Sequence, residues 1–221
     1  MTEPQEHLSH QAYRLLSGLI LQRELAGGDV VIEERLAEQF NISRTPMREA
    51  ILRLAAEGLL VKRGNRSFSV RTVTAAEFFQ SHSVRELLEP EAVELAVGKV
   101  PPGEIDEIRE MIVRLGATEV QERALWDLDD RLHLLFADAS GNAVLARMIR
   151  QVRVTTRLFE VSQPLRRVRK DAAEHLTILD AFADGDAKGA RKAMVRHVRN
   201  LVDDTMAILR GIMPPDNNAR G

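Results

Sequence analysis

The sequence of 221 residues contains no cysteine. Without thiol groups the chain can form neither a disulfide framework nor a thiolate metal site. Any metal ion that it binds must therefore be held by histidine, aspartate or glutamate side chains. The absence of cysteine also agrees with a location in a reducing cytoplasm.

The sequence also lacks any apolar run approaching the roughly 20 residues that a helix needs to span a bilayer. Its N-terminus carries Glu3 and Glu6, where a secretory signal would carry positive charge. We therefore expect a cytoplasmic protein that is neither exported nor inserted into a membrane.

An overall excess of positive charge is absent as well, since the formal net charge is −2. The basic residues are nevertheless unevenly distributed, because residues 41–73 contain seven arginines or lysines and only two glutamates. A basic cluster of this kind is the expected electrostatic feature of a phosphate-binding surface. On charge alone, an ordinary solvated surface remains the alternative.

The composition is that of an ordinary folded protein, and the length suits two domains that each bury a core. Apolar spacing predicts helices over residues 1–25 and 33–40, and a third helix that Ser43 caps and Gly58 ends. Two short β-type runs, 59–61 and 68–70, then flank a polar and basic stretch, which is typical of a hairpin. Residues 1–73 are thus predicted to form a winged helix-turn-helix domain.

The remainder of the chain is predicted to be all α-helical. Thr74 and Glu77 have the spacing of a capping box, which places the domain boundary just before residue 74. Residues 74–213 are expected to form a helical bundle, and residues 214–221 a disordered tail. The predicted helices of the bundle are residues 74–97, 104–115, 119–139, 142–160, 169–183 and 186–211.

The exposed start of the third helix carries Arg44, Thr45 and Arg48. In a winged helix-turn-helix this helix enters the major groove, where an arginine can donate two hydrogen bonds to the edge of a guanine. A helix N-terminus also favours a phosphate group. The simpler alternative is that these residues form a solvated helix start.

The stretch EERLAEQFNISRTPMREAILRLAAEGLL resembles the signature of the GntR family of bacterial transcription regulators, and SRTPMREA is its most distinctive part. The order of helices that follows resembles the effector-binding FCD domain of the FadR subgroup. Because one recognition helix reads only a few base pairs, we expect a homodimer that binds a palindromic double-stranded DNA operator. The resemblance implies contacts to DNA from the helix residues Ser43, Arg44, Thr45 and Arg48, and from the wing residues Arg63, Asn65 and Arg66.

Three positions depart from the family pattern. The family favours Pro-Gly where Gly27-Gly28 stands, a glycine where Ser67 stands, and often an arginine where Glu34 stands. These departures bear on the contacts of the wing and on the contribution of Arg35.

Three histidines of the second domain lie within apolar helical stripes. Asp129 stands four residues before His133, so the two side chains project from one helix face and can hold one ion. On spacing alone, core histidines satisfied by hydrogen bonds are the favoured alternative. The stretches DDRLHLLFADASGN, EHLTILDAFADGD and AMVRHV resemble those that carry metal ligands in FCD domains. The resemblance implies a divalent ion, zinc or nickel, held by Asp129, His133, His175 and His197.

A polar face is also predicted on the first helix of the second domain, where His82, Arg85 and Glu89 follow at spacings of three and four. The stretch VRELLE again resembles the family. Arg85 could bind a small carboxylate effector beside the metal. An ion pair between Arg85 and Glu89 within the helix is the alternative.

The sequence therefore predicts a transcription regulator whose affinity for DNA is controlled by a small effector. A metal-dependent hydrolase is the alternative, because a His/Asp metal site with open positions can activate water. No motif in the sequence identifies the general base that such a hydrolase would use. An enzyme would also leave the predicted DNA-reading segment unexplained. A constitutive architectural DNA protein would have no need for a second domain with a polar pocket.

Overall fold

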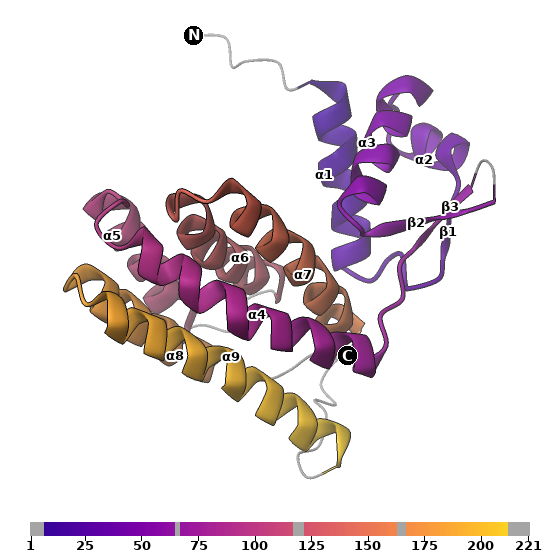
Figure 1. The fold of residues 1–221 in the computed structure, drawn as a ribbon. Coiled ribbons are helices and arrows are strands. Elements are labelled where there is room, and N and C mark those ends of the chain that lie inside the picture. The colour runs from indigo at the N-terminus through magenta and orange to yellow at the C-terminus, as the bar shows by residue number, and fades with distance from the viewer. Residues whose placement is uncertain (1–6, 65–66, 117–121, 163–166, 212–221) are drawn as a thin grey trace, which may run out of the picture. The chain divides into compact units, whose positions relative to one another are not determined.

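A computed structural model describes residues 7–64, 67–116, 122–162 and 167–211 (Figure 1). The described residues form nine helices and one three-stranded sheet. The chain falls into two compact units, of which the first contains residues up to 78 with 154–163 and the second contains the rest. The predicted tail, residues 214–221, lies outside the described residues.

Three helices belong to the first unit: α1 (Leu8–Leu21), α2 (Glu33–Gln39) and α3 (Arg44–Ala56). The turn between α2 and α3 contains Asn41 at φ 51°, a left-handed conformation that asparagine tolerates better than most residues. Gly58 at φ 86° follows α3 and ends it, as predicted. The helix α1 ends earlier than the sequence predicts.

The predicted hairpin is present as β2 (Leu60–Arg63) and β3 (Ser67–Val70), which pair antiparallel. A further strand that the sequence analysis did not predict, β1 (Val30–Val31), pairs with the other edge of β3. The order of strands is therefore β1-β3-β2. With two residues, β1 is too short to show the alternation from which a strand is recognised.

The core of this winged helix-turn-helix lies between the helices and the sheet. Leu16 of α1, Met47 and Leu54 of α3 and Leu60 of β2 are almost completely buried. Because α1 packs along α3, the apolar residues of α3 turn inward and its polar residues remain exposed (Figure 1).

Six further helices follow in the order that the sequence predicts, with small shifts at their ends. They are α4 (Ala75–Ala96), α5 (Pro102–Gly116), α6 (Glu122–Ala139), α7 (Ala143–Ser162), α8 (Val168–Ala183) and α9 (Ala187–Leu209). Every helix of the described residues is too short or too polar to cross a bilayer.

The predicted capping box before α4 is half formed. The backbone N–H of Glu77 donates to Oγ1 of Thr74 at 3.2 Å, which satisfies one free amide of the first turn. The Glu77 carboxylate, however, accepts from the guanidinium of Arg71 and does not return to the backbone. An ion pair with a charged neighbour has replaced the second arm of the box.

The core of the second unit is built from residues of α4, α5, α6, α8 and α9. The rings of Phe136 and Phe182 pack with their centroids 4.8 Å apart, and Leu132, Ile178 and Val198 are fully buried. α8 lies along α9 in this core (Figure 1). Because the three histidines stand in the same stripes as these residues, packing of the core turns them inward.

Candidate functional site

The residues predicted to read DNA lie at the start of α3. Ser43, Arg44, Thr45 and Arg48 are all exposed, whereas Met47 on the same turn is buried. The Ser43 backbone has the extended conformation of a helix cap, with φ −66° and ψ 158°. Its hydroxyl nevertheless makes no capping hydrogen bond among the described residues. Ser43 is therefore the N-cap residue by its backbone conformation, and the predicted hydrogen bond from its side chain is wrong. The exposed hydroxyl does not reach back to the first-turn amides.

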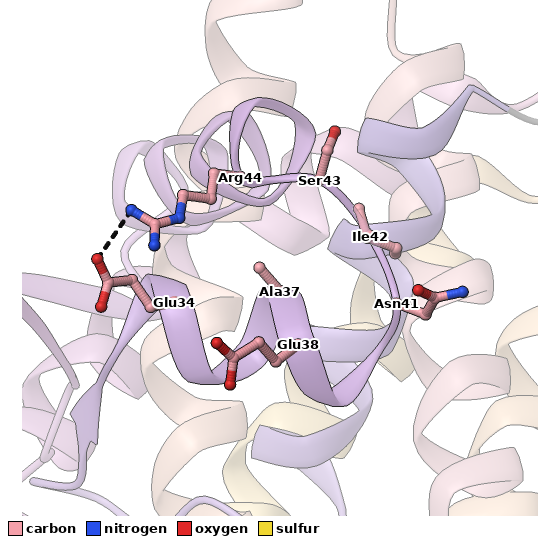
Figure 2. Close-up of a pocket in the computed structure, with 7 residues that line it drawn as sticks. All are labelled: Glu34, Ala37, Glu38, Asn41, Ile42, Ser43 and Arg44. Atoms are coloured by element: carbon pink, nitrogen blue, oxygen red, sulfur yellow. Dashed lines mark ion pairs between the residues drawn. The ribbon is translucent and has the colours of Figure 1, made fainter.

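Arg44 forms an ion pair with Glu34 of α2, with 2.8 Å between Nη1 and Oε1 (Figure 2). Both side chains are largely exposed, at 65% for Arg44 and 62% for Glu34. The pair spans one end of a pocket between α2 and α3 that is lined by Glu34, Ala37, Glu38, Asn41, Ile42, Ser43 and Arg44. The acidic residue that departs from the family pattern thus contacts a residue predicted to read DNA.

Of the three predicted wing residues, Arg63 lies at the end of β2, and Asn65 and Arg66 lie outside the described residues. The Nε of Arg63 donates to Oγ of Ser69 at 3.0 Å, across the hairpin. The backbone carbonyl of Arg63 accepts a hydrogen bond from the hydroxyl of Ser67. Ser67, which stands where the family favours glycine, therefore adds a hydrogen bond between β2 and β3 at the end of the hairpin.

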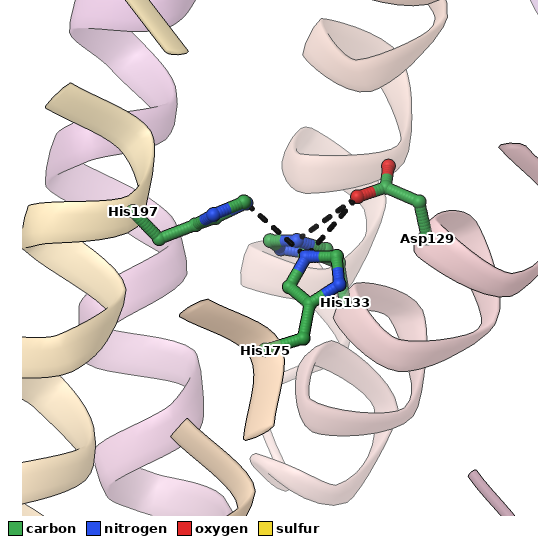
Figure 3. A group of neighbouring side chains, drawn as sticks. All are labelled: Asp129, His133, His175 and His197. Atoms are coloured by element: carbon green, nitrogen blue, oxygen red, sulfur yellow. Dashed lines mark hydrogen bonds and ion pairs between the residues drawn. The ribbon is translucent and has the colours of Figure 1, made fainter. Parts of the chain in front are cut away.

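Four side chains in the second unit converge on one point (Figure 3). Asp129 and His133 come from α6, His175 from α8 and His197 from α9. One ligand atom of each lies within 4.8 Å of those of the others. The sequence predicted this set of four residues, and the structure brings all of them together.

The distances between these ligand atoms suit a metal ion. The Nε2 of His175 lies 3.3 Å from the Nε2 of His197 and 3.4 Å from Oδ1 of Asp129. The same carboxylate oxygen lies 3.5 Å from the Nε2 of His133. Metal–ligand bonds of about 2.1 Å place neighbouring ligand atoms about 3.0 Å apart at the right angles of a six-coordinate site and about 3.4 Å apart at the tetrahedral angle. An ion at the centre would therefore require little rearrangement.

The polar atoms themselves also fit a metal. The Nε2 of His133 is buried and makes no hydrogen bond among the described residues, although its ring is fully enclosed. Burial and the Arg153 charge lower the pKa of His133 to about 4, and burial and His175 lower the pKa of His197 to about 3. Both rings are therefore neutral at pH 7, which is the form that offers a lone pair to a metal.

Arg153 of α7 orients the carboxylate of the cluster. Its Nη2 lies 2.6 Å from Oδ2 of Asp129 and 2.6 Å from Oδ1 of Asp130. One oxygen of Asp129 is thus bound by the guanidinium, and the other faces the histidines. Partial burial would raise the pKa of Asp129, but the Arg153 charge holds it well below its usual value. Asp129 is therefore ionised, as a metal ligand must be.

The predicted polar face of α4 is also buried. Arg85 donates from Nε to Oε1 of Glu89 at 2.7 Å, so the ion pair considered as the alternative is present. Arg153 approaches the same carboxylate at 3.5 Å, and Oε2 of Glu89 lies 2.8 Å from Nδ1 of His133. Burial would raise the pKa of Glu89, but Arg85 and His133 hold it well below its usual value. The α4 face is thus connected directly to the histidine cluster.

A second group of ionisable residues surrounds Arg167, which lies just before α8. Its buried guanidinium contacts the carboxylates of Asp171, at 2.7 Å, and of Glu174 and Asp204. Asp171, Glu174 and His197 lie close enough together to suggest a second metal site. The arginine already supplies the positive charge at these carboxylates, so a cation there would meet repulsion.

Sequence reasoning missed three residues that belong to the site: Arg153, Glu174 and Arg167. Arg153 had a detectable signal, because it lies four residues after the buried Ile149 and three before the buried Thr156, on one helix face. Glu174 and Arg167 had none, since their contacts to His197 and Asp204 join segments more than 20 residues apart.

Comparison with known proteins agrees with this organisation. The family model of the bacterial regulatory proteins of the gntR family matches residues 8–70, and that of the FCD domain matches residues 80–200. The Nta operon transcriptional regulator of Aminobacter aminovorans is 28% identical over 186 residues, which cover 83% of this chain and 88% of that protein. The transcriptional repressor RspR of Escherichia coli K12 is 24% identical over 213 residues, covering 93% and 92%.

A solved structure, that of E. coli McbR/YncC, has a TM-score of 0.72 at 25% identity and covers 91% of this chain and 99% of its own. The winged helix-turn-helix, the helical bundle and the predicted family are thereby confirmed. The hydrolase alternative has no support, because the family and the named relatives are regulators of transcription. The chain belongs to the gntR family of bacterial regulatory proteins, carries an FCD domain, and is a DNA-binding transcription regulator and not an enzyme.

Proposed function

We propose that this regulator binds a palindromic operator as a homodimer in the cytoplasm, and that a small carboxylate bound beside a metal ion in the FCD domain controls its affinity for DNA. FCD domains bind metal ions. The observation that carries the proposal for this chain is the convergence of Asp129, His133, His175 and His197 on one point.

Zinc and nickel are the ions that suit this set of ligands. Imidazole nitrogen and carboxylate oxygen are common ligands of both ions, whereas calcium and magnesium prefer sites made of oxygen alone. Four protein ligands in a five- or six-coordinate site leave positions for water or for an oxygen of an effector. When bound, the ion would supply a Lewis-acidic centre that attracts such an oxygen.

The charges around the cluster favour an anionic effector once a divalent cation is present. Arg85 and Arg153 stand against three carboxylates, those of Glu89, Asp129 and Asp130. With neutral histidines the metal-free cluster has one excess negative charge, and a divalent cation would reverse the sign. An arginine such as Arg85 can also donate two hydrogen bonds to a carboxylate. To do so, Arg85 would exchange part of its pairing with Glu89 for the effector.

In the first unit, four exposed residues at the start of α3 are proposed to contact the operator in the major groove: Ser43, Arg44, Thr45 and Arg48. The wing residues Arg63, Asn65 and Arg66 are proposed to contact the DNA backbone. The dimer follows from the size of the reading surface. One recognition helix contacts only a few base pairs, so a two-fold pair of helices doubles the site that is read.

The proposal of a metal is tested by elemental analysis of the purified full-length protein. We expect one equivalent of metal per chain after incubation with zinc or nickel and desalting. His175→Ala and His197→Ala each remove a ligand and should lower the metal content, whereas His10→Ala, at a histidine of α1, should not.

A wild-type protein that retains no stoichiometric metal, and whose thermal stability is unchanged by zinc and by nickel, would refute the metal site. The cluster would then be a set of core histidines satisfied by hydrogen bonds.

A further inference from the structure

His197 contacts a carboxylate with the ring nitrogen that faces away from the cluster. Its Nδ1 lies 2.8 Å from Oε2 of Glu174, and its ring is completely buried. On the opposite side of the ring, Nε2 faces the Nε2 of His175 at 3.3 Å. One imidazole therefore joins the ligand cluster to an outer carboxylate.

The protonation states at this contact follow from simple chemistry. The Glu174 carboxylate lies against the guanidinium of Arg167 and accepts a hydrogen bond from the amide of Asn200, and both contacts favour its ionised form. An ionised carboxylate only accepts hydrogen bonds. The proton of the neutral His197 ring must therefore lie on Nδ1, and the lone pair must lie on Nε2, on the side of the cluster.

The carboxylate of Glu174 is itself held in place from two sides. Its Oε1 accepts a hydrogen bond from the amide of Asn200 at 2.7 Å, and its Oε2 contacts the guanidinium of Arg167. Arg167 is fixed in turn by Asp171 and Asp204, and its side chain is 3% exposed. Glu174 therefore has little freedom to leave the histidine.

We propose that Glu174 is a positioning residue that fixes the tautomer and the ring orientation of His197, so that its Nε2 is presented to the metal. The inference rests on the proposed metal site and deepens it. A carboxylate on the far nitrogen of a metal-binding histidine also makes the ligand more basic, and loss of such a group typically weakens metal binding about 10- to 100-fold.

Oε2 of Glu89 lies 2.8 Å from Nδ1 of His133, but this pair lacks the geometry of a hydrogen bond. Glu89 also neutralises the buried Arg85, so its removal would disturb the fold as well as the histidine. Glu174 is the better position for a test. When it is replaced, Arg167 keeps two other carboxylates, those of Asp171 and Asp204.

The test is the affinity of the full-length protein for Zn²⁺, measured by competition with a chromophoric chelator at constant pH. Glu174→Ala should bind Zn²⁺ about 10- to 100-fold more weakly than the wild type. Glu174→Gln keeps an oxygen acceptor without the charge and should lie between the two. Asp204→Asn is the matched control, because it removes a carboxylate from Arg167 without contacting a histidine, and it should bind as the wild type does.

A second measurement does not depend on metal. In ¹⁵N spectra of the metal-free protein, His197 should be the Nδ1–H tautomer in the wild type and in Asp204→Asn, and a mixture of tautomers in Glu174→Ala. If Glu174→Ala does not fold, Glu174→Gln carries both measurements.

Wild-type affinity and an unchanged tautomer in a folded Glu174 variant would overturn the inference. If the wild type itself binds no Zn²⁺, the proposed metal site fails, and the tautomer measurement still decides whether Glu174 positions His197.

Discussion

Arg44 is the residue at which the DNA-reading surface can be tested most directly. It lies at the exposed start of α3, where two hydrogen bonds to a guanine are possible. We expect Arg44→Ala, and likewise Arg48→Ala, to weaken binding to a selected operator by about 1–3 kcal/mol. The measurement is a titration of labelled operator at one fixed salt concentration.

The matched control for Arg44 is another arginine of α3. Arg53 is engaged with Glu57 at 2.9 Å and lies over the ring of Tyr13, so Arg53→Ala should leave operator affinity nearly unchanged. Glu34→Gln should act in the opposite direction, because it removes a negative charge beside Arg44 and releases the guanidinium for DNA. Operator binding that is the same in the wild type, Arg44→Ala and Arg48→Ala would exclude both arginines from the interface.

His82 makes the stability of the protein depend on pH. Burial and the Arg85 charge lower its pKa to about 2, while Glu89 acts in the opposite direction and His197 and Arg153 lower it further. In the unfolded chain the pKa of a histidine is about 6.5. As the pH falls below that value the unfolded chain takes up a proton and the folded chain does not, so His82 destabilises the fold in acid.

We therefore expect His82→Gln to flatten the pH dependence of the free energy of unfolding between pH 7 and pH 5. The slope should fall by at most about 1.4 kcal/mol per pH unit, the value for one proton. Denaturant unfolding of the metal-free protein at several pH values measures the slope. A slope in His82→Gln that equals the wild-type slope would show that His82 takes up protons equally in the folded and the unfolded chain.

Single residues differ in how far the sequence could predict their roles. Asp129 and His133 were predictable as a pair because a helix places residues four apart on one face. The addition of His175 and His197 required a resemblance, since no local rule brings three helices together. The contact of Arg153 with Asp129 joins two helices, and only folding determines it.

At the scale of the helices, α9 depends on the cap at its first turn. The Asp186 side chain accepts a hydrogen bond from the backbone N–H of Gly189 at 2.9 Å. A Cβ at position 189 would lie 2.2 Å from a carboxylate oxygen of Asp186, so glycine allows the close approach. The cap therefore stabilises the helix that carries His197.

We expect Asp186→Ala to lower the free energy of unfolding by about 0.5–2 kcal/mol, because a free amide of the first turn loses its acceptor. Asp186→Asn keeps an oxygen acceptor and should cost much less. Denaturant unfolding of the three proteins gives the comparison. If alanine and asparagine had the same effect, the loss of the aspartate charge near the helix N-terminus would be responsible and not the hydrogen bond.

The helices were the part of the fold that the sequence predicted best. Apolar stripes and glycine stops are local signals, and Gly58 and Thr74 lie where they were expected to end and begin a helix. Local signals fail where tertiary pairing decides. The short β1 exists because β3 offers it a free edge, and the side chain of Glu77 turns to Arg71 because that charge lies within reach.

For the whole molecule, the proposed effector site and the residues proposed to read DNA lie in different units of the chain. An effector can alter DNA affinity only if it binds the DNA-competent state and the other states with unequal affinity. The effect must then be reciprocal. Operator DNA must change the affinity for the effector by the same factor as the effector changes the affinity for the operator.

This reciprocity gives the prediction for the whole protein. From a panel of small mono- and dicarboxylates, we take the compound that most stabilises the zinc-loaded protein against heat. This carboxylate should change the Kd for the operator by about 5- to 150-fold. Saturating operator should change the Kd for the carboxylate by an equal factor. Two titrations, one of operator with and without the carboxylate and one of the carboxylate with and without operator, test the equality.

Arg85 decides whether the effector acts through the predicted residue. Arg85→Lys keeps the positive charge beside Glu89 but loses the planar fork that suits a carboxylate, so it should fold, bind zinc and bind operator as the wild type does. Its response to the carboxylate should be much smaller, because two parallel hydrogen bonds have been replaced by a point charge. If Arg85→Lys responds fully to the carboxylate, with equal factors in both titrations, Arg85 does not bind the effector. The two sites would still be coupled, and Arg85 would serve only as the ion-pair partner of Glu89.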